Sequence, residues 1–153
     1  MPIKPTIAIA LLALSTTVAA SEKDADYVPY PGTIPVTIQA IDSPISAQVR
    51  FESYPGFQQV NWVTIPGLQV PSPAGKSGCE RQLAADALAF SNDFLADAKK
   101  VTMRDMHMVT SADDEGYAPI STNKGSLGAK LQAKGYARPN STDPKKPWCK
   151  DEE

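Results

Sequence analysis

The stretch that decides the fold is residues 34–52, which read IPVTIQAIDSPISAQVRFE. Apolar residues alternate with other residues on both sides of Asp42-Ser43-Pro44, and this is the period of a half-buried strand. Pro35 lies at the start of the first run, where a strand tolerates a missing backbone N–H. The alternation predicts two strands, 34–41 and 45–52, with a turn between them.

Three more strands and a short helix are expected further along the chain. Turn residues and apolar periodicity place these elements at 58–65, 100–110 and 117–122 for the strands and at 127–134 for the helix. Pro119 interrupts the last strand and so weakens it. Gly135 follows the short helix and suits a left-handed cap.

A longer helix is predicted to begin after Ser77. Ser77 and Glu80 have the spacing of a capping box, in which the Ser hydroxyl accepts from the third helical N–H and the Glu carboxylate reaches back to the Ser N–H. Gly75-Lys76-Ser77 also resembles the end of a phosphate-binding loop, but Val70 stands where that loop needs its earlier glycine. Capping is therefore the better explanation of Ser77. Helical spacing then predicts one buried stripe of Cys79, Leu83, Ala87, Phe90 and Phe94.

The N-terminus has the pattern of a signal peptide. Lys4 precedes a short apolar run at 7–14, and Val18-Ala19-Ala20 is a small-residue cleavage site. The apolar run is too short to span a bilayer, so no membrane span is expected after cleavage near Ala20. We expect a signal peptide at 1–20 and a periplasmic or secreted location. The remaining chain would comprise a polar lead at 21–31, one domain at 32–139 and a tail at 140–153.

Net charge and the two cysteines limit the function further. Removing residues 1–20 leaves 14 basic and 17 acidic residues, a net charge of about −3, which disfavours nucleic acid as a partner. Two cysteines in an exported chain favour one disulfide, Cys79–Cys149, which would hold the tail; two independent thiols are the alternative. The single histidine of the chain leaves too few ligands for a zinc site.

Short motifs along the chain resemble those of the staphylococcal nuclease-like (thermonuclease) family. The motifs are Ile41-Asp42-Ser43-Pro44-Ile45, Gly67-Leu68-Gln69-Val70-Pro71, Cys79-Glu80-Arg81, Gly135-Tyr136-Ala137-Arg138-Pro139 and Trp148-Cys149. The family's first two motifs read Ile-Asp-Gly-Asp-Thr and Gly-Ile-Asp-Ala-Pro-Glu. The resemblance covers about residues 31–149. It implies an α+β, mainly β fold, a five-stranded Greek-key OB barrel with two to three packed helices.

The resemblance also implies that the catalytic residues have been lost. Family members cleave phosphodiesters with one calcium ion, which two aspartates hold. A glutamate acts on the attacking water, and two arginines stabilise the phosphate. In this sequence the two metal ligands fall on Pro44 and Gln69, and the glutamate falls on Ser72. The two arginines fall on Thr64 and Asp114, and neither residue supplies a guanidinium.

We therefore expect a non-catalytic member of this family, with no catalytic or metal-binding residue and no cofactor. Its role would be binding or structural, and its partner an unidentified periplasmic protein. The alternative is a divergent metal-dependent phosphodiesterase acting on DNA or RNA, for which calcium would be the cofactor. The only candidate catalytic or metal-binding residues for such an enzyme are Asp42, Asp105, His107 and Asp113.

Binding of nucleic acid without catalysis is a third hypothesis. Tyr54, Phe57 and Trp62 could line a groove on which bases stack, as in other OB barrels. No Lys or Arg accompanies them, so we expect them to pack in the barrel instead.

Overall fold

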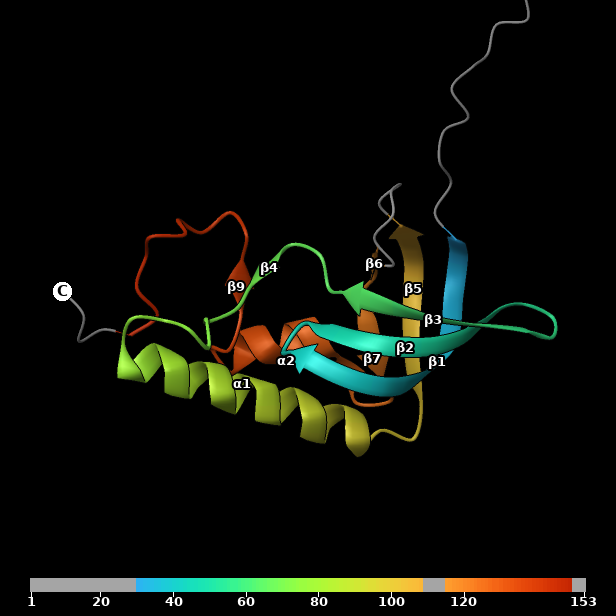
Figure 1. Cartoon of the computed structure of the whole chain (residues 1–153), viewed down its shortest axis with the longest axis horizontal. Helices are drawn as coiled ribbons and strands as arrows, with labels where there is room; N and C mark the ends of the chain where they lie inside the picture. The colour runs from blue at the N-terminus through green and yellow to red at the C-terminus, as the bar shows by residue number, and fades with distance from the viewer. Residues whose placement is uncertain (1–29, 109–114, 150–153) are drawn as a thin grey trace, which may run out of the picture.

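The structure is a computed structural model of the chain, and it describes residues 30–108 and 115–149 (Figure 1). The predicted signal peptide and cleavage site lie outside the described residues, as do Asp113 and Asp114. None of the helices in the described residues has the length and apolar character needed to cross a membrane.

Five strands close into a β-barrel. They are β1 (Tyr30–Ser43), β2 (Ser46–Tyr54), β3 (Phe57–Thr64), β5 (Val101–Met108) and β6 (Glu115–Tyr117). They pair in the order β1-β2-β3-β6-β5, and β1 pairs with β5 to complete the ring. The pairings are antiparallel except for β3 with β6, which is parallel. The fold is therefore α+β and mainly β, and the barrel is consistent with an OB-like architecture.

Strand β1 closes the barrel because its two halves pair with different neighbours. Residues 30–36 pair with β5, and residues 37–43 pair with β2. Register shifts between Ile38 and Ala40 and between Ile41 and Ser43 mark irregularities of the kind that let a strand bend. The predicted strand at 34–41 is thus the middle of a 14-residue strand.

The predicted strand at 117–122 is two short strands, β6 and β7 (Ile120–Thr122). Pro119 lies between them and has no N–H to donate to a ladder. The neighbouring backbone is still bonded, because Ala118 N donates to Thr64 O at 3.2 Å and Arg104 N donates to Pro119 O at 3.3 Å. The chain therefore stays beside β5 across the break, and β6 and β7 pair with successive parts of β5.

The smaller strands lie outside the barrel ring. β8 (Gly125–Ser126) pairs with β7 and extends that side of the sheet. β4 (Leu68–Gln69) and β9 (Arg138–Pro139) form a separate two-stranded sheet, which joins the segment before the long helix to the C-terminal segment.

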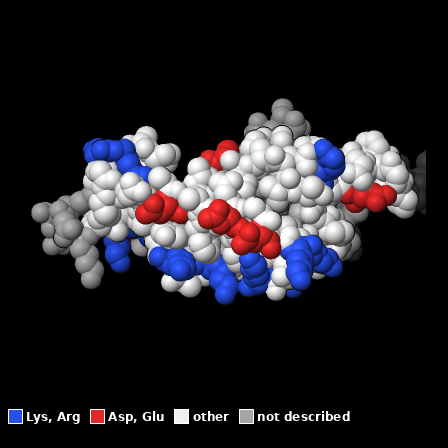
Figure 2. Space-filling model, turned by 90° about the horizontal axis from the view of Figure 1, so that it is seen from below, with Lys and Arg blue, Asp and Glu red and all other residues white. Residues whose placement is uncertain are grey.

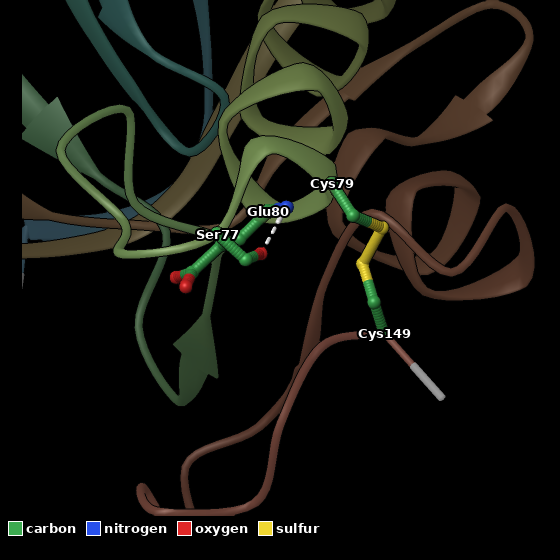
Figure 3. The surroundings of a disulfide bond; sticks show 4 residues. All are labelled: Ser77, Cys79, Glu80 and Cys149. Atoms are coloured by element: carbon green, nitrogen blue, oxygen red, sulfur yellow. Dashed lines mark hydrogen bonds between the residues drawn. A yellow bond between two sulfur atoms is a disulfide. The ribbon is translucent and has the colours of Figure 1, made fainter. Parts of the chain in front are cut away.

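Two helices accompany the barrel, α1 (Gly78–Ala96) and α2 (Leu127–Ala133). Ser77 caps α1 as predicted, since its hydroxyl accepts from Glu80 N at 2.9 Å (Figure 3). The other half of the capping box is wrong. The Glu80 carboxylate accepts from Ser72 N at 3.0 Å and so fastens the preceding loop to the helix.

The buried face of α1 consists of Ala84, Ala87, Ser91, Phe94 and Leu95. The predicted stripe is therefore correct at Ala87 and Phe94. Leu83 and Phe90 are only half-buried, and Cys79 is exposed on the side of the helix that meets the tail. The core beneath the helix is filled by side chains from the barrel strands, including Val49, Val63 and Met103, and by Ile120 of β7.

Candidate functional site

Pro44, at the first predicted metal-ligand position, is buried in the turn between β1 and β2. Its carbonyl oxygen accepts a hydrogen bond from the Ser91 hydroxyl at 2.8 Å, and Ser91 itself is 0% exposed. The next residue is also held, because Ile65 N donates to Ile45 O at 2.8 Å. The turn is thus bonded to α1 and to the end of β3, and Pro44 offers no carboxylate to a cation.

Ser91 has a structural role that the sequence did not reveal. Among the described residues it is the one polar side chain that is buried. A buried hydroxyl without a partner would be costly, and the Pro44 carbonyl removes that cost for both groups. A small polar residue seven positions after Ala84 and four after Ala87, in an otherwise apolar face, is the signal that points to such a bond.

Thr64 stands at the end of β3, where the resemblance expects an arginine. Its hydroxyl donates to Glu115 Oε1 at 2.8 Å, which links β3 to β6. Thr64 pairs with Ser46 on β2, so it lies at the same end of the barrel as the Pro44 turn. The Glu115 carboxylate therefore lies beside this position, and its negative charge repels a phosphate.

Gln69, at the second predicted metal-ligand position, uses both ends of its amide in internal hydrogen bonds. Nε2 donates to the carbonyl oxygens of Asn140 at 3.1 Å and Thr142 at 2.9 Å. Oε1 accepts from Arg138 Nε at 3.0 Å. Gln69 therefore holds the start of the C-terminal tail against β4.

Arg138 extends this anchor along the tail. Its Nη1 donates to Lys146 O at 2.8 Å, and its guanidinium carbon lies 4.1 Å from the centre of the Trp148 ring. The sequence predicted a hold on the tail only through the Cys79–Cys149 disulfide, and the structure adds further contacts. Gln69, Arg138 and Trp148 order it as well, although the motif that contains Arg138 gave no indication of its contacts.

Ser72, at the position of the catalytic glutamate, organises the loop before α1. Its hydroxyl accepts from Ala74 N at 3.2 Å, and its carbonyl accepts from Gly75 N at 3.0 Å. Together with the bond from Ser72 N to Glu80, these contacts make Ser72 the centre of a turn. Ser72 itself supplies no carboxylate, and the neighbouring Glu80 carboxylate accepts from the Ser72 backbone N–H.

The predicted disulfide between Cys79 and Cys149 is present, with the two Cα atoms 6.4 Å apart (Figure 3). The bond joins the first turn of α1 to the end of the described tail, across a sequence separation of 70. It is compatible with an exported protein, because disulfides persist in oxidising compartments.

Of the residues considered for a divergent phosphodiesterase, Asp42 is not brought together with Asp105 and His107 of β5, and Asp113 lies outside the described residues. Asp105 lies beside the start of β1, where Oδ1 accepts from Gly32 N at 3.3 Å, whereas Asp42 lies near the end of β1. His107 stacks on Tyr117, with ring centroids 5.7 Å apart. Within residues 30–108 and 115–149, no group of three or more His, Cys, Asp or Glu side chains could hold a metal ion.

The aromatic residues of the β2–β3 hairpin do not all pack in the barrel, which corrects the prediction. Tyr54 is 60% exposed and Phe57 is 44% exposed. Their rings stack on each other, with centroids 4.9 Å apart and planes 2° from parallel. The hairpin extends away from the barrel (Figure 1). Trp62 is half-buried and pairs with Glu115 of β6.

Both signs of charge occur on the face that α1 covers. In Figure 2 basic side chains line one long edge of this face, and acidic side chains run beside them. α1 contributes Asp86 and Asp93, and Asp97 follows its last residue; all three are exposed. Such a mixture weakens the attraction for phosphate that a surface of one sign would exert.

The Gln69→Ala variant is expected to loosen the tail. The loss of three hydrogen bonds, partly exposed, should lower the free energy of unfolding by about 1–2 kcal/mol and speed amide exchange in residues 140–148. Urea unfolding and hydrogen–deuterium exchange measure the two effects. Gln58→Ala, at an exposed position of β3, is the matched control. Equal effects of the two variants would contradict the anchoring role of Gln69.

Comparison with known proteins adds no assignment. No protein-family model matches the chain, and no curated protein matches it either. The assignment of a function therefore depends on the residues and contacts described above.

Proposed function

We propose that the chain is an exported, non-catalytic relative of the staphylococcal nuclease-like proteins. Its role is binding or structural, with a periplasmic protein as the partner. The observation that carries this proposal concerns four positions at which the family has metal-binding or catalytic residues. Each position holds a side chain without formal charge, and each takes part in internal hydrogen bonds. These residues are Pro44, Thr64, Gln69 and Ser72.

The chemistry of hydrolysis explains why these contacts matter. Calcium prefers several carboxylate oxygens, and the transition state of phosphodiester cleavage needs cations beside its phosphate oxygens. The Pro44 carbonyl and the Gln69 amide are already bonded to other parts of the chain. A general base at Ser72 is also missing, and such a base normally contributes about 10²–10⁴-fold to a rate. Hydrolysis by the family's route would lack each of these contributions.

The barrel and its disulfide support a role that needs a stable scaffold. Its core residues are buried, the tail is fastened by Gln69 and Arg138, and the N-terminus of α1 is linked covalently to the tail. A protein that has kept its packing but lacks its reactive side chains is suited to binding.

A hydrolysis assay tests the proposal directly. Purified protein lacking residues 1–20 is incubated with DNA and with RNA in the presence of calcium, and we expect no cleavage above the buffer control. Cleavage that a chelator abolishes would refute the proposal. If that cleavage persisted in Gln69→Ala, the reaction would use a site other than the family's.

Two further measurements separate the alternatives. We expect calcium to leave the melting temperature unchanged, because a ligand stabilises only the state that binds it. A strong rise would instead indicate a retained metal site. Retention on single-stranded DNA that falls with salt would favour the nucleic-acid hypothesis.

A further inference from the structure

A groove of about 620 Å³ lies between β1 and the C-terminal end of α1. One wall is residues 35–41 of β1, and the other is formed by Asn92, Leu95, Ala96 and residues 98–101. Figure 1 shows the second half of β1 running above the last turns of α1, in line with these lining residues.

The groove lies against the backbone edge of β1. Side chains of a strand alternate between two faces, so a groove on one face would be lined by alternate residues. Here seven consecutive residues, 35–41, line the groove. The pairing of β1 explains this. β5 leaves β1 at Val36, and from Thr37 onward β1 pairs with β2, so no described strand occupies its other edge.

Both ends of the groove are fixed by pairing or hydrogen bonding. At one end Val36 pairs with Val101, and at the other the Pro44 carbonyl accepts from Ser91. The lining residues 35–41 of β1 cover six residue steps, which span roughly 20 Å at about 3.3 Å per residue. That length holds an extended segment of five to seven residues, roughly the length of an ordinary strand.

The side chains along the groove are apolar near its middle and cationic at one end. Ile38 and Ile41 are half-buried, and Ala40 and Ala96 are exposed. Lys99 and Lys100 are the charged side chains among the lining residues, and no Asp or Glu is among them.

The neighbouring charges described next do not neutralise the positive charge at this end of the groove. Across the sheet Arg50 pairs with Thr37 and donates to the Gln39 side chain, which adds a further positive charge nearby. The acids of the same helix stretch are Asp93 and Asp97, and neither is a lining residue. Asp97 instead pairs with Lys124 at 3.3 Å.

We propose that this groove binds an extended segment of a partner protein, which adds to β1 as a further strand and places a carboxylate beside Lys99 and Lys100. Main-chain hydrogen bonds to β1 would supply affinity, and the apolar and cationic positions would supply specificity. The carboxylate is that of an acidic side chain or of a chain terminus. The proposal names a partner class for the binding role proposed above and rests on that role.

Peptide selection tests the proposal. Random heptapeptides are displayed in two libraries, one with a free C-terminus and one embedded in a carrier, and are selected on the protein lacking residues 1–20. We expect enrichment of peptides that alternate apolar with other residues and carry an acid near one end. Enrichment in the first library alone would assign the carboxylate to a chain terminus, and enrichment in both would assign it to a side chain.

Three comparisons assign the binding to the groove. Lys99→Glu/Lys100→Glu should weaken binding of the best peptide by at least about tenfold, while Lys145→Glu/Lys146→Glu, an equal charge change on the tail, should not. Ala96→Trp fills the groove and should abolish binding, while Ala85→Trp, at an exposed position elsewhere on α1, should not. N-methylation of alternate peptide amides should weaken binding in one register only, because a strand donates to one neighbour through every second N–H. Fluorescence anisotropy gives the affinities, and circular dichroism and thermal melting confirm that each variant is folded.

Several results would overturn the proposal. The first is that no peptide is enriched in the selection. The second is that the groove variants and the control variants weaken peptide binding equally. The third is that the protein self-associates and that Ala96→Trp makes it monomeric. The last result would show that a second copy of the chain fills the groove. Failure of peptide binding together with absent hydrolysis would leave the non-catalytic proposal standing. Calcium-dependent hydrolysis would refute that proposal whatever the peptides do.

Discussion

The Cys79→Ser/Cys149→Ser variant is expected to lose roughly 4 kcal/mol of its free energy of unfolding. The disulfide closes a loop with a sequence separation of 70, and the chain-entropy model gives this magnitude for a loop of that length. The loss is a large part of the roughly 5–15 kcal/mol that stabilises a typical domain. Urea unfolding followed by circular dichroism measures it.

Reduction provides the control for this prediction. A thiol reductant should shift the unfolding midpoint of the unmodified protein toward that of the variant and leave the variant unchanged. A loss below about 1 kcal/mol would mean that the contacts of Gln69 and Arg138 already restrict the tail without the covalent bond. Combining the variant with Gln69→Ala would then measure how far the two anchors depend on each other.

The Leu131→Ala variant should lose about 2–5 kcal/mol, the range for removing a buried leucine side chain. Leu131 is 0% exposed and lies in α2, a helix of seven residues. A helix this short is not stable alone in water. Its stability therefore depends on the burial of Leu127 and Leu131 in the core. The variant should therefore lose order in the whole of α2, which amide exchange would detect.

Leu88→Ala is the matched control for Leu131→Ala. Leu88 is half-buried on α1 and does not belong to the buried core. Its replacement removes the same atoms, and we expect it to cost about 1 kcal/mol or less. Similar losses in the two variants would contradict the view that α2 is held by its buried leucines.

Most elements could be predicted from the sequence because their signals are local. Alternating residues on either side of Asp42-Ser43-Pro44 predicted β1 and β2, and Ser77 marked the start of α1. The full length of β1 could not be predicted, because its first residues are ordered by pairing with β5, about 70 residues away. Closure of the barrel depends on the same distant pairing.

The structural roles of the candidate site residues were much harder to predict. A sequence can show that Gln69 is no carboxylate, but not that its amide meets the backbone of Asn140 and Thr142. The bond between Ser91 and Pro44 likewise joins residues 47 positions apart. Exposure of Tyr54 and Phe57 was missed because alternation predicts a strand but not how far its hairpin extends beyond the core.

The small sheet of β4 and β9 has a consequence for the order in which the molecule can be completed. Leu68 and Gln69 pair with Pro139 and Arg138, and Cys79 finds its partner only at Cys149. During synthesis from the N-terminus, β1, β2 and β3 are available early. The β4–β9 sheet and the Cys79–Cys149 disulfide can form only after residues 138–149 have been made. A chain cut short before Arg138 would lack the partners of β4 and of Cys79, and its first helix would carry an unpaired thiol.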